Sequence, residues 1–185
     1  MKATGIVRRI DDLGRVVIPK EIRRTMRIRE GDPLEIYTDR EGEVIFKKYS
    51  PIGELAAFAA QYAETLYKTC SLSVVITDRD AVIACAGVPR KEYTDKSLSE
   101  ELERLIEGRS LFVQKEDATP VAVLADGGNH VVRCAMPIIS GGDIIGCVAS
   151  VCERDGEVRR DAPSGEVEQK LVITAAGFLG RQLEG

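Results

Sequence analysis

Hydrophobic and polar residues alternate in short runs through the first fifty positions of the chain. These runs are rich in Val and Ile, which favours β-strands, and Gly-containing turns separate them. The expected strands cover residues 5–10, 15–18, 34–38 and 44–48. A brief helix at 20–26 follows Pro19, a residue that suits the first turn of a helix. Apolar side chains fall on both faces of the first strand, so both of its faces need cover.

A unit of residues 1–50 is too small to provide that cover by itself. Even a domain of ~60 residues hides only about 60 % of the surface that its unfolded chain exposes. We therefore expect two copies of this unit to interleave as a dimer, with each copy covering the strands of the other.

Longer elements follow after residue 50. The spacing of apolar residues predicts helices at 53–69 and 164–183, and a third that begins at a capping box of Ser97 and Glu100 and ends at Gly108. The other expected elements are strands at 71–77, 81–86, 111–114, 121–124, 130–139 and 144–151, turns at 127–129 and 141–143, and an acidic loop at 153–163. Helices that bracket several consecutive strands predict an α+β fold with an antiparallel sheet.

Charge divides the chain at the same place as the elements do. Residues 1–50 hold 12 basic and 9 acidic side chains, a net of +3, whereas the rest hold 14 and 21, a net of −7. Pro51 and Gly53 punctuate the junction. We therefore predict two domains, residues 1–50 and 51–185.

A basic segment on an acidic protein predicts a polyanion as its partner, because Lys and Arg side chains set against phosphates release condensed counterions. Arg23 and Arg27 lie four residues apart on the short helix, a spacing at which like charges repel unless an anion is near. No expected helix in this domain is long enough to lie along a major groove as a recognition helix does. Contacts to the DNA backbone and readout of DNA shape are therefore favoured over a strict base code.

Three short motifs resemble the DNA-binding domain of the AbrB family of transition-state regulators. They are the sequences at residues 5–8 (GIVR), 13–19 (LGRVVIP) and 21–24 (EIRR). The resemblance implies an intertwined, swapped-hairpin β-barrel dimer that binds double-stranded, A/T-rich promoter DNA. The basic residues that match or adjoin the family's DNA contacts are Arg8, Arg9, Arg15, Lys20, Arg23 and Arg24.

Residues 135–148 resemble the late-strand signature of GAF sensor domains, and the whole chain is similar to AbrB–GAF regulators of Gram-positive spore formers. This resemblance implies regulation of sporulation genes, by activation or by repression, and a GAF-like domain that senses a small-molecule effector or mediates assembly. We expect a tetramer in which the two helices that flank this domain join the dimers. The interface residues expected on these helices are Leu55, Phe58, Tyr62 and Leu66, and Val172, Ala176, Leu179 and Leu183.

Few residues of the second domain are of types that suggest a catalytic, metal-binding or ligand-binding role. We expect the lone histidine, His130, at the surface or in a turn, and Arg133 either to pair with a buried acid or to face a pocket. The odd number of cysteines and the lack of a C-x-x-C pair argue against disulfides and zinc. The cysteines are Cys70, Cys85, Cys134, Cys147 and Cys152. We predict no catalytic residue, metal or cofactor, and no ligand-binding residue can be assigned.

Two alternatives stay open. GAF proteins that reduce free methionine sulfoxide need a low-pKa thiol in a pocket, whereas Cys134 and Cys147 lie in apolar strands and read as small hydrophobes. An antitoxin would share the swapped-hairpin domain but would carry a disordered toxin-binding tail. No apolar run approaches the ~18 residues of a membrane span, and the first residues lack a signal-peptide core, so we expect a cytoplasmic protein without a membrane partner.

Overall fold

The computed structural model describes residues 4–156 and 161–184. The chain divides into two compact units, Met1–Tyr49 and Ser50–Gly185, and each is described by itself.

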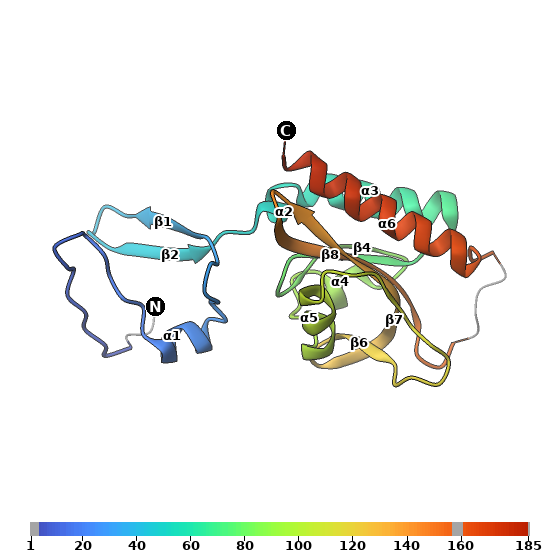
Figure 1. Cartoon of the computed structure of the whole chain (residues 1–185), viewed down its shortest axis with the longest axis horizontal. Helices are drawn as coiled ribbons and strands as arrows, with labels where there is room; N and C mark the ends of the chain where they lie inside the picture. Colours follow the sequence, from blue (N-terminus) through green and yellow to red (C-terminus); the bar gives the residue numbers. More distant parts are fainter. Residues whose placement is uncertain (1–3, 157–160, 185) are drawn as a thin grey trace. The chain divides into compact units, whose positions relative to one another are not determined.

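The first unit contains a short helix and a β-hairpin (Figure 1). Helix α1 (Lys20–Thr25) follows Pro19, and strands β1 (Leu34–Thr38) and β2 (Val44–Lys48) pair antiparallel with Ile36 opposite Phe46. Gly42 adopts a φ of +86° in the connecting turn, a conformation that favours glycine. The hairpin and the helix are thus confirmed where the alternating pattern predicted them.

The two strands predicted at residues 5–10 and 15–18 are wrong for the single chain. Both segments lack strand assignments, and within the described residues neither joins a sheet. The turn between them is present, since the Asp11 N–H donates to the Arg15 carbonyl at 3.0 Å. A strand needs a hydrogen-bonded neighbour, and the rest of this small unit supplies none.

A six-stranded antiparallel sheet forms the centre of the second unit. Its order is β4-β3-β8-β7-β5, and β6 also pairs with β7. The strands are β3 (Val74–Thr77), β4 (Val82–Ala86), β5 (Phe112–Val113), β6 (Val121–Leu124), β7 (Gly127–Ser140) and β8 (Asp143–Glu153). The predicted α+β fold, with an antiparallel sheet flanked by helices, is confirmed.

Helices cover both faces of this sheet (Figure 1). The helices among the described residues of this unit are α2 (Pro51–Glu54), α3 (Ala56–Cys70), α4 (Arg90–Tyr93), α5 (Glu100–Glu107) and α6 (Gly165–Gln182). Helices α3 and α6 bury Ala63, Leu66 and Leu179 against one face of the sheet. Helices α4 and α5 bury Tyr93 and Leu102 against the other, so the two faces have separate hydrophobic clusters.

Three local predictions need correction. The cap of α5 is Ser99, whose hydroxyl accepts from the Leu102 N–H at 3.1 Å, because the Ser97 backbone is engaged in a β-bridge with Ala81. The turn expected at 127–129 falls at 125–126, and those glycines begin β7. The short α4 was not predicted. Of the loop expected at 153–163, residues 157–160 lie outside the described part.

Within the described residues, no helix combines the length and the apolar character needed to cross a membrane.

Candidate nucleic-acid interface

The six basic residues predicted to bind DNA all lie on the segment that runs from residue 8 to the end of α1. Five of them are exposed and Arg23 is half-buried. On α1, Lys20 stands three and four residues before Arg23 and Arg24, so helical spacing brings these three onto one side. Arg8 and Arg9 lie on the extended segment, before the turn that carries Arg15.

Asp11 organises the turn that presents Arg15. Its Oδ1 accepts hydrogen bonds from the backbone N–H groups of Leu13 at 3.0 Å and of Arg15 at 2.8 Å. Its Oδ2 accepts from the Arg15 Nε at 2.8 Å. The backbone and then the side-chain hydrogen bonds from Arg15 lower the pKa of Asp11. The sequence predicted a turn at residues 11–14 but not this role of Asp11, although Asp side chains often accept hydrogen bonds from nearby backbone N–H groups in turns.

Arg23 differs from the other basic residues in its burial. Its Nε is shielded from solvent and has no hydrogen-bond partner among the described residues. A buried donor without a partner carries a desolvation cost in the single chain.

Lys48 has a structural role in this unit. Its Nζ donates to the Arg27 carbonyl at 2.8 Å and lies 3.7 Å from Asp32 Oδ2. Arg27 itself sits in the left-handed region with a φ of +52°, just after α1 ends. These contacts tie strand β2 to the end of α1 and so fix the helix that carries Arg23 and Arg24.

Apolar side chains in this unit are largely exposed. Among residues 4–49, only Pro19 is buried. The exposed large hydrophobic residues are Ile6, Val7, Ile10, Leu13, Val16, Val17, Met26, Ile36, Tyr37, Val44, Phe46 and Tyr49. A domain rarely leaves so many large apolar side chains exposed unless another chain covers them.

In the second unit, His130 and Arg133 lie on β7. The expectation of a surface or turn position for His130 is wrong, because the residue is 7 % exposed. Its N–H donates to the Tyr93 hydroxyl at 3.2 Å, and that hydroxyl lies 2.9 Å from His130 Nδ1. Arg133 pairs with a buried acid, since its Nη2 lies 3.0 Å from Glu168 Oε2. This pairing is one of the two possibilities predicted for Arg133.

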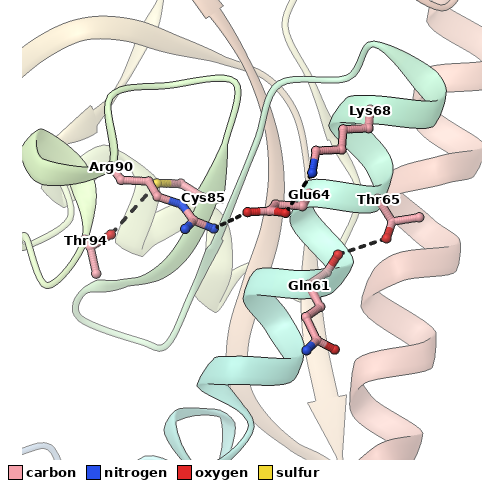
Figure 2. Close-up of polar contacts among 7 residues, drawn as sticks. All are labelled: Gln61, Glu64, Thr65, Lys68, Cys85, Arg90 and Thr94. Atoms are coloured by element: carbon pink, nitrogen blue, oxygen red, sulfur yellow. Dashed lines mark hydrogen bonds and ion pairs between the residues drawn. The ribbon is translucent and has the colours of Figure 1, made fainter.

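Three buried thiols of this unit are poorly suited to nucleophilic chemistry. Burial raises the pKa of Cys134 to about 11 and raises the pKa of the fully buried Cys147 further. Cys85 is also buried with a raised pKa, and its Sγ lies 3.9 Å from the Thr94 Oγ1 (Figure 2). A thiol above its ordinary pKa holds little thiolate at neutral pH, which disfavours the reductase alternative.

A protein-family model described as "Stage V sporulation protein T C-terminal, transcription factor" matches residues 54–184. The chain is also 55% identical over 188 residues to stage V sporulation protein T of Bacillus subtilis (strain 168), across 100% of this chain and 99% of that protein. The chain belongs to the stage V sporulation protein T family.

Further similarities of this member of the stage V sporulation protein T family divide between its two units. Residues 7–53 match a model described as "Antidote-toxin recognition MazE, bacterial antitoxin". The transition state regulatory protein AbrB of Bacillus subtilis (strain 168) is 65% identical over 51 residues, which are 28% of this chain and 52% of AbrB. A solved structure of the Thermosynechococcus elongatus PixJ GAF domain is 13% identical, with a TM-score of 0.49, and covers 74% of this chain and 89% of that one.

Replacing Asp11 with alanine in this stage V sporulation protein T homologue should weaken DNA binding several-fold. Alanine removes both acceptor oxygens, so the turn and the Arg15 guanidinium lose their common anchor. Asp11→Asn should keep most of the affinity, because its amide oxygen still accepts from the backbone N–H groups. Fluorescence anisotropy with a labelled A/T-rich duplex measures both variants.

The matched control is Asp12→Ala, which changes the net charge by the same amount but leaves the Asp11 contacts in place. If Asp11→Ala binds DNA as tightly as Asp12→Ala does, Asp11 does not position Arg15.

Proposed function

We propose that this protein is a transcription regulator of sporulation genes, in which residues 1–50 bind double-stranded DNA and residues 51–185 sense an effector or mediate assembly. The observation that carries this proposal is the cluster of basic side chains on residues 8–24, five of them exposed, in a chain of net charge −4. The full-length similarity to stage V sporulation protein T supports the same assignment.

The arginines supply both attraction and geometry. A guanidinium is planar, always charged, and can donate two parallel hydrogen bonds to one phosphate. The helix α1, with the six residues Lys20–Thr25, is too short to read a major groove along its length. We therefore expect readout mainly through phosphate contacts and DNA shape, with a preference for A/T-rich sites, whose minor groove is narrow.

Binding to promoter DNA tests this function directly. The full chain should bind an A/T-rich duplex more tightly than a G/C-rich duplex of equal length. The logarithm of its affinity should fall linearly with the logarithm of salt concentration, with a slope of about −0.9 for each phosphate neutralised. An affinity that does not change with salt would contradict the proposal.

The exposed apolar surface of the first unit supports an interleaved dimer through residues 1–50. The segments 5–10 and 15–18 lack strand partners in the single chain, and a second copy could supply them. The dimer would then form the swapped-hairpin barrel expected from the AbrB resemblance.

Replacing Ile36 with Asp should dissociate this dimer. Ile36 is 61 % exposed in the single chain and faces Phe46 across the hairpin, so the new carboxylate would enter an apolar interface. Light scattering should give at least two chains per particle for the wild type and a lower mass for the variant. A wild-type monomer at micromolar concentration would refute the dimer itself.

An aromatic cluster on helices α3 and α6 supports the proposal of a second interface, through which two dimers would form a tetramer. Phe178 on α6 stacks near Phe58 and Tyr62 on α3, with ring centroids 5.9 and 5.5 Å apart. This aromatic cluster is only partly covered within one subunit, since Phe178 is 39 % exposed. A second copy would cover it and so join two DNA-binding dimers.

A further inference from the structure

Two cavities meet at the Arg133–Glu168 ion pair of the second unit. One has a volume of about 320 Å³ and the other of about 380 Å³, and both residues line both cavities. Volumes of this order fall within the range of roughly 300–1,000 Å³ that small-molecule sites occupy.

The position of Arg133 is unusual for a strand residue. The register between β7 and β8 shifts between Val132 and Cys134, so Arg133 is the extra residue of a β-bulge. Bulges redirect side chains and often stand beside functional sites. Its partner Glu168 is 3 % exposed near the start of α6, so this helix contributes a buried carboxylate to the cavity wall.

The ion pair leaves hydrogen-bonding capacity unused. Arg133 Nη2 lies 3.0 Å from Glu168 Oε2, and the Arg133 side chain is still 29% exposed. A guanidinium carries five N–H donors and a carboxylate carries two acceptor oxygens. No described residue forms a hydrogen bond with Glu168 Oε1, so this oxygen can accept one from a ligand.

Gln114 contributes a third group to the larger cavity. Its backbone N–H donates to the Arg133 carbonyl at 2.7 Å, which places it beside the ion pair. Its Nε2 donates to the Lys115 and Ala118 carbonyls, and this fixes the orientation of the carboxamide. Its Oε1 is closed to solvent and has no partner among the described residues, so Gln114 contributes to the wall of the cavity but offers no accessible acceptor.

Together, Arg133 and Glu168 offer donors for a carboxylate and an acceptor for an ammonium within one cavity. We propose that this cavity binds a free α-amino acid with an apolar side chain. Arg133 holds the α-carboxylate, while Glu168 Oε1 accepts from the α-ammonium. Val113, Pro120 and Val131 supply apolar wall for the side chain. The ion pair supplies no net charge of its own, which suits a zwitterion better than a simple anion.

This inference rests on the sensing part of the proposed function and does not depend on DNA binding. Occupancy would contact β5, β7 and the start of α6, and α6 belongs to the proposed tetramer interface. A ligand could therefore shift the assembly, but only by as much as it prefers one arrangement over the other.

Isothermal titration calorimetry of the full chain tests the site with L-valine, L-leucine, L-isoleucine and L-methionine. At least one should bind saturably at millimolar concentration or below. For leucine, the matched probes are isoamylamine, which lacks the carboxylate, and 4-methylpentanoate, which lacks the ammonium. Each should bind at least about tenfold more weakly than leucine, because each leaves a charged group of the cavity unpaired. Absence of saturable binding by all four amino acids, or binding of the two analogues as tight as that of leucine, would overturn the proposal.

Two variants test whether the amino acid binds in this cavity. Glu168→Gln and Arg133→Gln should each weaken amino-acid binding by at least about tenfold. The matched controls are Glu100→Gln and Arg104→Gln, which alter an exposed ion pair on α5 and should leave binding unchanged. Unchanged binding in a folded Glu168→Gln or Arg133→Gln variant would contradict the site. Should those variants fail to fold, the analogue comparison on the wild type still decides.

The same preparation should be tested for binding to A/T-rich DNA. Intact DNA binding without amino-acid binding would refute this inference and leave the proposed function standing. Amino-acid binding without DNA binding would refute the proposed function instead.

Discussion

Simultaneous replacement of Arg8, Arg15, Arg23 and Arg24 with alanine should weaken binding to A/T-rich promoter DNA by about a thousandfold or more. Each arginine that donates to a phosphate makes a charge-assisted hydrogen bond, and a dimer presents each of the four arginines twice. The salt dependence should become shallower by roughly one unit of slope for each phosphate that the variant no longer neutralises. Anisotropy titrations over a range of salt concentrations measure both effects.

The control is a variant of equal charge change in which Lys91, Lys96, Lys115 and Lys170 become alanine. These four lysines are exposed on the second unit. The control should retain most of its affinity, because long-range attraction alone is largely screened at physiological salt. If the folded arginine variant binds with unchanged affinity and slope, these arginines are not the DNA-binding residues.

The hairpin of the first unit could be predicted almost to the residue, whereas the preceding strands could not. Strands β1 and β2 pair with each other, so local alternation and Gly42 contain the information that defines them. Residues 5–10 and 15–18 have the same alternation but find no partner in the single chain. Alternation predicts which residues can form a strand, while the partner depends on surfaces that can belong to another chain.

The basic residues of the candidate interface were accessible to sequence reasoning because charge clustering is a local property. Only one half of the Arg133–Glu168 pair could be predicted from the sequence. Arg133 was expected to pair with a buried acid or to face a pocket, but the acid could not be identified. The bulge that displaces Arg133 arises from the register of two long strands, which no local pattern encodes. Glu168 reads as an ordinary acid in the first turn of a helix, where the helix dipole favours it. Its burial follows from packing of α6 on the sheet.

The same packing corrects the expected tetramer interface on the last helix. Val172, Ala176, Leu179 and Leu183 were expected to form an apolar line for a second copy, but the first three are buried within one subunit. Leu66, expected in the interface on α3, is buried in the same way. The helix is apolar on two sides, and sequence alone could not assign which side meets the sheet. The exposed side carries Val167, Ile173 and Phe178 instead.

Two neighbouring substitutions on α6 should therefore have opposite effects. Leu179 is fully buried against the sheet, so Leu179→Glu places an unpaired carboxylate in the core and should abolish cooperative unfolding of the second unit. Phe178→Glu should leave that unit folded, with a destabilisation of about 1 kcal/mol for each aromatic pair that is removed. In solution this variant should convert tetramers to dimers, because the cluster with Phe58 and Tyr62 would carry a charge.

Sedimentation and thermal unfolding of the two variants separate assembly from folding. A Phe178→Glu protein that remains tetrameric would place the second interface elsewhere on the molecule. A folded Leu179→Glu protein would contradict the burial of that residue. A wild-type chain that sediments as a simple dimer at high concentration would refute the tetramer. Helices α3 and α6 would then only close the core of one subunit, because an exposed cluster forms an interface only where another copy covers it.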